Sequence, residues 1–239
     1  MTKMRDSWSL LALIVLITLR NGASQKDFGY ESLFETYDKE IPEECFSLHD
    51  RLPFEPGTWV IPSVAKFEMG GYNFTSVLDG FGKFNKFSFS DQGSVASVCF
   101  SSKMIGSGFY NTSVDKGKVA PSILFMDTTP PLNYRSMEIL NGPNDNVYVN
   151  TANVGVKMIS LTDSQYMLQF SMDDLNIENL IDFADTLDTG KMSTGSAHVH
   201  MRGDCVIGID PQCKMDGSKT EVLLYEMCPN GKNFHRKGN

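Results

Sequence analysis

Two histidines in the last fifth of the chain have a spacing that could support metal chemistry. His198 and His200 stand at i and i+2 in Ser196-Ala197-His198-Val199-His200, which puts both imidazoles on one face of a strand. Such a pair can bind a metal ion, yet two neutral imidazoles rarely suffice without a third or fourth ligand. The spacing alone therefore leaves a metal site and an ordinary strand face as open alternatives.

The tripeptide Arg202-Gly203-Asp204 follows directly and has the composition of an integrin-binding motif. Gly-Asp is turn chemistry in its own right, so we interpret the tripeptide as a hairpin turn and do not expect an integrin partner. Other catalytic signatures are missing from the sequence. Gly106-Ser107-Gly108 begins a dinucleotide-binding pattern that fails at Asn111, where a third glycine is required.

The N-terminus has the pattern of a secretory signal peptide. A short basic stretch precedes the apolar segment Trp8–Leu19, and small polar residues follow up to Ser24. Twelve residues are too short to span a bilayer, which needs about 20, so we predict cleavage near Ser24 and export of the chain. An uncleaved signal anchor is the alternative, because Arg20 closes the apolar segment abruptly.

Export gives two other features a meaning. Asn73-Phe74-Thr75 and Asn111-Thr112-Ser113 are N-glycosylation sequons, so Asn73 and Asn111 are candidate glycan sites. Cysteines of an exported protein can pair in an oxidising compartment. The five cysteines are Cys45, Cys99, Cys205, Cys213 and Cys228. Five is odd, so one thiol stays free or pairs between chains, and the sequence leaves the connectivity open.

Composition and charge narrow the class of protein. The 239 residues are 41% hydrophobic and 21% charged, as expected for one large globular domain or two small ones. The net charge of -8 excludes binding to a nucleic-acid backbone, which needs a basic face. With 20 glycines, 10 prolines and 16 phenylalanines, the chain favours a turn-rich β fold.

Short apolar segments separated by turn residues predict an all-β fold. The expected strands are 83–89, 95–105, 119–126, 147–151, 154–162, 165–170, 199–209 and 221–227. Residues 175–187 could instead form a helix, because apolar side chains recur there at helical spacing. Residues 25–56 are expected to be an irregular lead-in, and 229–239 a polar tail without a closing strand or helix.

Several blocks, in order between about residues 57 and 227, resemble the animal carotenoid cleavage oxygenases. The blocks are Thr75–Phe89, similar to N-H-W-F-D-G-x-x-x-L-H-K-F-x-F; Val98–Met104, similar to V-x-Y-x-S-R-F; Asp145–Asn150, similar to D-N-x-x-V-N; Ser160–Asp163, similar to A-C-T-E; and Gly195–His200, similar to G-A-T-A-H-P-H. Each block is weak by itself, and their order and spacing make the resemblance fairly specific.

The resemblance implies a fold and a chemistry. The family is a seven-bladed β-propeller with Fe(II) on its axis, held by four histidines from separate blades, and it cleaves double bonds of carotenoids and retinoids with dioxygen. It implies an apolar polyene partner and allows contact with a membrane surface. His198 matches the first iron ligand, and Asp163 matches a glutamate that orients a metal-bound histidine. The role of His200 stays open.

The departures from the family are equally informative. A blade takes about 40–45 residues, so the segment 57–228 holds only part of a propeller. Only His198 of the four iron ligands is identifiable; Ser76 stands where the family has histidine, and Asp163 is one methylene shorter than glutamate. Pro130-Pro131-Leu132 replaces a membrane-associated segment and lacks its cysteine. We therefore expect an incomplete and inactive oxygenase, or alternatively a secreted, non-catalytic glycoprotein that binds apolar ligands or a protein partner.

Overall fold

The computed structural model describes residues 30–92, 95–122, 127–182, 192–193, 195–213, 220–229 and 235–237. The chain divides into two compact units, Met1–Glu35 and Thr36–Asn239. The described part of the first unit is a short 3-10 helix, η2 (Tyr30–Phe34). The predicted signal segment lies outside the described residues, and everything below concerns the second unit.

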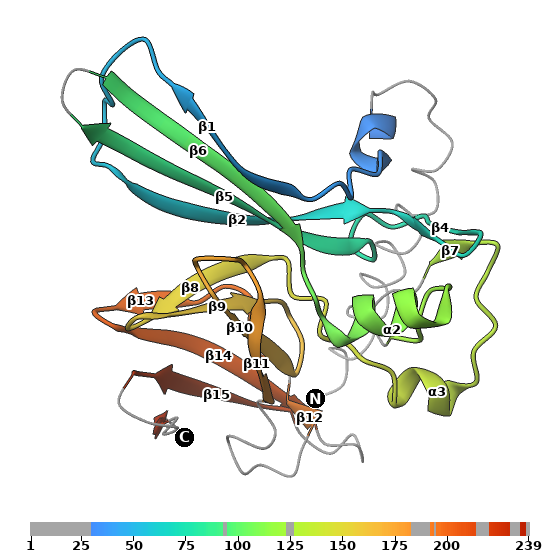
Figure 1. Cartoon of the computed structure of the whole chain (residues 1–239). Coiled ribbons are helices and arrows are strands. Elements are labelled where there is room, and N and C mark those ends of the chain that lie inside the picture. The colour runs from blue at the N-terminus through green and yellow to red at the C-terminus, as the bar shows by residue number, and fades with distance from the viewer. Residues whose placement is uncertain are drawn as a thin grey trace. The chain divides into compact units, whose positions relative to one another are not determined.

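The second unit is mostly β, which confirms the expected fold class at that level (Figure 1). Its strands are β1 (Ile41–Ser47), β2 (Gly57–Lys66), β3 (Glu68–Met69), β4 (Tyr72–Phe74), β5 (Phe81–Gln92), β6 (Val95–Met104), β7 (Thr128–Thr129), β8 (Asn150–Val154), β9 (Lys157–Leu161), β10 (Tyr166–Phe170), β11 (Ile177–Asp182), β12 (Met192–Ser193), β13 (His200–Arg202), β14 (Cys205–Cys213), β15 (Thr220–Met227) and β16 (His235–Lys237). The helices are α2 (Gly108–Lys116) and α3 (Ser136–Leu140).

The strands form four antiparallel sheets. Sheet 1 has the order β1-β6-β5-β2, and sheet 2 has the order β11-β10-β9-β8. Sheet 3 has the order β12-β14-β15-β16, with β13 also paired to β14, and sheet 4 has the order β3-β4-β7. Sheet 2 is a plain meander, because each of its strands pairs with the next one in the sequence.

Sheet 2 has a covered face on each side, and the alternation of side chains along β10 shows this directly. Leu168 and Phe170 point into the cluster that contains Phe84 of sheet 1. Met167 points the other way, into the cluster that contains Val206 and Tyr225 of sheet 3. Sheets 1 and 3 therefore each bury one face against sheet 2.

Helix α2 is an element that the sequence reasoning missed, although its ends carry ordinary signals. Ser107 is the N-cap, and its side chain accepts a hydrogen bond from the backbone amide of Tyr110. Gly117 ends the helix in the left-handed conformation, with φ of 61°. Phe109 packs its ring 4.9 Å from that of Phe81, so the helix covers the end of β5.

Two disulfides join neighbouring strands and their ends. Cys45 of β1 pairs with Cys99 of β6, and Cys205 of β14 pairs with Cys228 directly after β15. Cys213 is the fifth cysteine. Two disulfides fit an oxidising compartment, in line with the predicted export. In the described part of the chain, no helix has the length and apolarity needed to cross a membrane.

The structure differs from two expected strands and from the alternative helix at 175–187. Residues 119–122 form no strand, and the rest of the expected strand 119–126 lies outside the described residues. Val119 is fully buried there without pairing, because it packs beside α2 in the cluster with Phe109. Residues 177–182 form β11 and not a helix, since β10 offers them a pairing partner; 183–187 lie outside the described residues. The expected strand 199–209 is a hairpin of β13 and β14.

The two segments expected to be irregular each contribute a strand. Within 25–56, β1 pairs with β6, and within the expected polar tail, β16 pairs with β15. Both are edge strands. β1 gains its partner from a distant part of the chain, whereas β16 pairs with the strand just before it and has only three residues, too few to show a sequence period. The turn predicted at Arg202-Gly203-Asp204 is confirmed: Gly203 has φ of 60° and connects β13 to β14.

Candidate functional site

The segment Gly195–Val199 lies directly before β13, and backbone contacts hold it against both neighbouring sheets. The amide of Gly195 donates to the carbonyl of Ser164 at 2.8 Å, and the amide of Ser196 donates to the carbonyl of Ile209 at 3.1 Å. The amide of His198 donates to the Ser196 side-chain oxygen at 3.1 Å. His198 is therefore held by a defined backbone.

Ala197, next to His198, is bound from two sides. Its amide donates to Oδ1 of Asp163 at 2.8 Å, and its carbonyl accepts from Nδ2 of Asn150 at 3.1 Å. Its own side chain is fully buried. The connection after β9 and the start of β8 thus both determine where His198 stands, although the carboxylate of Asp163 bonds to the backbone and makes no described contact with the imidazole.

Edge strands of the three large sheets, namely β2, β8 and β13, lie in this region. The Thr151 hydroxyl of β8 donates to the carbonyl of Val60 in β2 at 3.1 Å, which links sheets 1 and 2 at their edges. A cavity of about 400 Å³ lies between β8 and the β13 segment. It is lined by Asn150, Thr151, Ala152, Asn153, Val199 and Met201. The volume falls within the range of small-molecule pockets, about 300–1,000 Å³.

The described residues do not fit a resident iron. His198, His200 and His49 all have exposed side chains. Among the residues that the structure describes, the groups of three possible ligands are Glu43 with Cys45 and Cys99, and Glu226 with Cys205 and Cys228. In both groups the cysteines are joined in disulfides and offer no thiolate, and neither group contains a histidine.

In the Asp145–Asn150 block, which resembles the oxygenase family, two side chains hydrogen-bond to the backbone of other elements and hold them in place. The Asn146 side chain accepts from the amide of Gly82 at 3.1 Å and donates to the carbonyl of Gly80 at 2.7 Å. The carboxylate of Asp145 accepts from the first two amides of α2, at 2.6 and 2.9 Å, where a negative charge also complements the helix dipole.

The Asp79-Gly80 pair is structural for related reasons. Oδ2 of Asp79 accepts from the amide of Asp127 at 3.1 Å. A Cβ on Gly80 would stand 2.3 Å from Cγ1 of Val64, so only glycine fits this close approach. The Tyr148 hydroxyl donates to the carbonyl of Leu78, and burial raises the pKa of Tyr148, so that hydroxyl stays protonated as a donor. These blocks hold the scaffold around the site and do not carry its chemistry.

Two buried lysines were also missed by the sequence reasoning. Lys83 is 1% exposed, and its ammonium donates to the carbonyls of Tyr37 and Lys39 at 3.0 and 2.6 Å. Burial lowers the pKa of Lys83. Lys86 donates to the carbonyls of Met172 and Asp173 at 3.2 and 3.1 Å, which fastens sheet 1 to the turn after β10.

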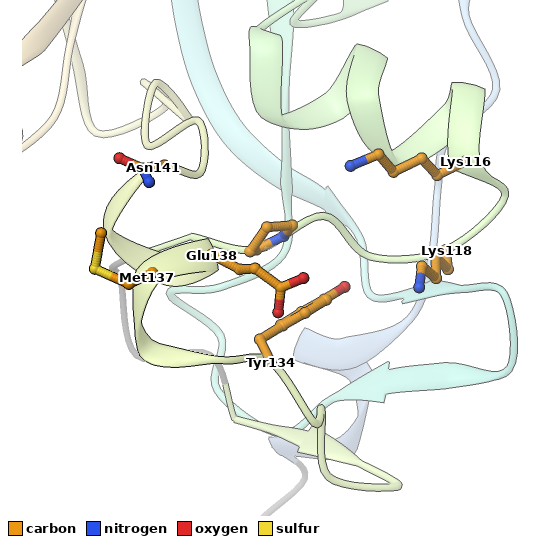
Figure 2. Close-up of a pocket in the computed structure, with 7 residues that line it drawn as sticks. Lys116, Lys118, Tyr134, Met137, Glu138 and Asn141 are labelled. Atoms are coloured by element: carbon orange, nitrogen blue, oxygen red, sulfur yellow. The ribbon is translucent and has the colours of Figure 1, made fainter.

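A second cavity, of about 440 Å³, lies between the end of α2 and α3 (Figure 2). It is lined by Lys116, Lys118, Pro121, Tyr134, Met137, Glu138 and Asn141. Nζ of Lys118 stands 5.9 Å from the centre of the Tyr134 ring, and the Tyr134 hydroxyl donates to the carbonyl of Val119. None of the site residues expected from the sequence lines this cavity, whose lining combines charged side chains with the apolar surfaces of Pro121, Tyr134 and Met137.

Both candidate glycan sites are accessible. Asn73 lies on β4 and Asn111 on α2, and both side chains are exposed. The Asn111 amide donates to the carbonyl of Gly106 at 3.1 Å. Attachment of a glycan at Asn111 would compete with this bond, whereas the Asn73 side chain makes no described hydrogen bond.

Comparison with known proteins gives a likeness of fold. No family model matches the sequence, and no curated protein matches it. A solved Synechocystis apocarotenoid oxygenase variant matches 87% of this chain and 43% of its own, with a TM-score of 0.68 and 17% identity. Cobalt-substituted Synechocystis apocarotenoid oxygenase covers the same shares at a TM-score of 0.61 and 16% identity.

A chimera of the oxygenase with RPE65 matches in the same way, with a TM-score of 0.64 and 16% identity. It too is covered over 43% of its length, so the chain spans less than half of the structures it matches. The resemblance that the sequence indicated is thus confirmed as a likeness of fold. The fold of this chain resembles a portion of the apocarotenoid oxygenase fold.

Proposed function

We propose that this chain is a carotenoid-oxygenase-like module, three blades of a seven-bladed propeller. The observation that carries the proposal is the fold likeness to apocarotenoid oxygenase over 87% of the chain. Sheets 1, 2 and 3 are four-stranded or larger, antiparallel and packed face to face in sequence order, as propeller blades are. The family reaction would be oxidative cleavage of a polyene double bond at Fe(II).

This chain by itself is proposed to lack that activity. His198 offers one imidazole, and a metal ion held by a single protein ligand exchanges with water readily. Asp163 bonds to the backbone amide next to His198 and not to an imidazole. Its expected role, which is to orient a metal-bound histidine, would need ligands from outside the described residues. Iron cleavage chemistry would thus belong to a larger assembly, with His198 as one contributor.

The part of the function that this chain can perform is the binding of an apolar ligand. The cavity between β8 and β13 is lined by Val199 and Met201 from the β13 segment and by Asn150, Thr151, Ala152 and Asn153 from β8. Ligand pockets commonly combine an apolar lining with a few polar groups that fix orientation. A polyene with a polar end group matches this lining.

A second candidate function, a secreted binding glycoprotein, is favoured by different observations. The two disulfides fit an exported protein, and Asn73 and Asn111 are both exposed. Glycosidase treatment of the exported chain is expected to reduce its mass, and the Asn73→Gln variant is expected to lose part of that reduction. Retention of the chain inside the cell with Met1 intact contradicts this candidate.

A ligand-binding titration tests the apolar-ligand proposal. Retinol added to the purified full chain is expected to show saturable binding, followed by quenching of tryptophan fluorescence. Met201→Asp places a charge in the cavity and is expected to weaken binding about tenfold or more, the cost of burying an unpaired polar group. Met137→Asp changes an exposed methionine of the other cavity and is the matched control. Binding that is absent, or equal in both variants, contradicts the proposal.

A further inference from the structure

A third cavity, of about 400 Å³, lies where β1 and β6 of sheet 1 face the turn after β10. It shares no lining residue with the cavity between β8 and the β13 segment. Lys86 of β5 and Ser101 of β6 line it, and only 7% and 8% of their surfaces are exposed. The two residues are cross-strand partners, so their side chains stand next to each other on one face of the sheet. A buried ammonium and a buried hydroxyl therefore form part of the cavity wall.

Both buried groups have hydrogen-bonding capacity that the described part of the chain leaves unused. Oγ of Ser101 has no hydrogen-bond partner there. The Lys86 ammonium carries three hydrogens and donates two of them, to the carbonyls of Met172 and Asp173. Oε2 of Glu43 stands 3.6 Å from Nζ, which is beyond hydrogen-bond distance. Because a buried polar group without a partner costs free energy, the pair indicates a ligand that offers an oxygen acceptor.

A β-bulge in β1 accounts for the position of Glu43. The register of β1 against β6 shifts between Ile41 and Glu44, where β1 has one residue more than β6. The extra residue lies opposite Ser101, and Glu43 faces Lys86 there. Bulges re-aim side chains and are frequent next to active sites. The bulge thus adds a carboxylate to the buried ammonium and hydroxyl.

The turn after β10 contributes Leu175 in an uncommon backbone conformation. Leu175 has φ of 57°, in the left-handed region that bulky residues rarely adopt. It is 3% exposed and lines the cavity. Such residues persist only where the surrounding structure holds them, and they cluster at functional sites. Together with Ile41 of β1, Leu175 gives the cavity an apolar part.

The charges around the cavity select the class of ligand. Lys86 is buried, whereas Glu43, Asp173 and Asp174 are exposed carboxylates of the same lining. These carboxylates repel a plain anion, and a plain cation offers Lys86 no acceptor, so a zwitterion suits the lining best. Nζ of Lys86 and Oε2 of Glu43 are 3.6 Å apart. The two charges of the ligand should therefore be similarly close, as they are in an α-amino acid.

We propose that this cavity binds an α-amino acid with an apolar side chain. The carboxylate of the ligand accepts from the Lys86 ammonium and the Ser101 hydroxyl, and its ammonium donates to Glu43 and Asp173. Hydrogen bonds that involve charged groups are the stronger class, and these would also satisfy the two buried groups. The inference depends neither on the cavity between β8 and β13 nor on a metal at His198.

Titration calorimetry of the full, oxidised chain with leucine tests the proposal. Leucine has an apolar side chain to match Ile41 and Leu175, and one saturable site per chain is expected. Two analogues each lack one charge: 4-methylpentanoate has no ammonium, and 3-methylbutylamine has no carboxylate. Each is expected to bind at least about tenfold more weakly, because it leaves part of the charged lining unpaired. Leucine that does not bind, or that binds no better than both analogues, overturns the proposal.

The Ser101→Ala variant distinguishes a ligand contact from a structural role. Since Oγ of Ser101 has no partner among the described residues, its removal is expected to leave the urea midpoint unchanged or to raise it. The dissociation constant of leucine is expected to rise about tenfold. Ser97→Ala is the matched control, because Ser97 lies on the same face of β6 outside the cavity lining. Leucine binding that is equal in both variants overturns the proposal.

The Glu43→Gln variant tests the contact with the ligand's ammonium, because it removes the negative charge and keeps the shape of the side chain. It is expected to weaken leucine binding about tenfold and to leave the binding of 4-methylpentanoate no weaker, since that analogue has no ammonium. Asp173→Asn replaces it if its urea midpoint shows a loss of folding. A variant that weakens both ligands equally, or weakens neither, overturns the proposal.

Discussion

The carboxylate of Asp163 accepts a hydrogen bond from the backbone amide of Ala197 at 2.8 Å, and this bond ties the connection after β9 to the residue before His198. The resemblance pairs Asp163 with a glutamate that orients a metal-bound histidine. In the structure the same carboxylate positions the histidine segment through the backbone. Asp163 is thus a positioning residue for His198, whatever occupies the site.

Removal of the Asp163 carboxylate should loosen the segment before β13. We expect Asp163→Ala to cost about 1.5–3 kcal/mol in the free energy of unfolding, the range for a hydrogen bond that a charged group accepts. Hydrogen exchange at the Ala197 amide should become faster. A general loss of stability of the same size would speed exchange throughout the chain and not at this amide alone. Asp115→Ala, on the exposed side of α2, is the control, and equal exchange in both variants contradicts the positioning role.

The contact between sheets 1 and 2 should depend strongly on one stacked pair of rings. Phe84 is fully buried, and its ring centroid lies 4.3 Å from that of Phe170. We expect Phe84→Ala to cost about 3–5 kcal/mol, the usual loss when a buried phenylalanine is truncated. The check is a urea titration followed by circular dichroism, with the exposed Val156→Ala as control. A loss below 1 kcal/mol would mean that the two sheets do not pack as described.

Much of the fold was predictable from the sequence because the relevant signals are local. The alternating segment at β5, the paired strands β9 and β10, and the Gly203 turn all follow from side-chain period and turn chemistry. Strand β1 was missed because it forms through pairing with a distant strand, and β16 was missed because its three residues are too few to show a period. A strand without its own period cannot be separated from a loop by local pattern.

The candidate site was predictable only in part, for a similar reason. The resemblance drew attention to His198 and Asp163, but the contacts of Ala197 with Asp163 and Asn150 join residues 34 and 47 positions apart. Buried Lys83 was missed because a lysine in a strand normally suggests a solvent-facing position. Its burial is tolerable because its ammonium donates to the carbonyls of Tyr37 and Lys39, which lie far from it in the sequence.

The two disulfides should contribute unequally to stability. Cys45 and Cys99 are 54 residues apart, and Cys205 and Cys228 are 23 apart. In the chain-entropy model, closing the longer loop contributes about 4 kcal/mol and the shorter about 3 kcal/mol. The paired Cys-to-Ser variants should therefore shift the urea midpoint in that order. Peptide mapping without reduction should recover both bridges, and a Cys45–Cys213 peptide in their place would contradict the pairing.

The segment before β1 should make stability depend on acid pH. The Lys66 ammonium bonds to Asp38 and lowers the pKa of that carboxyl below its ordinary value of 3.8. Because the unfolded chain binds a proton more readily, the stabilisation is complete above pH 3.8 and is lost as the pH falls through the lowered pKa. Urea midpoints measured between about pH 2 and 6 should show a smaller acid decrease in Asp38→Asn. The exposed Asp50→Asn variant is the control and should show the same acid decrease as the native chain. An equal decrease in the native chain and in Asp38→Asn would be inconsistent with this ion pair.

We propose that this chain, whose fold resembles that of apocarotenoid oxygenase, offers iron only the imidazole of His198 among its described residues. The most direct test is elemental analysis of the purified 239-residue chain after anaerobic incubation with Fe(II) and desalting, with His198→Ala in parallel and β-carotene bleaching as a second readout. The expected result is far less than one iron per chain, the same in both proteins, with no bleaching, because one ligand cannot hold the ion against water. One iron per chain that is abolished by His198→Ala would contradict the account and would show that other residues complete the site.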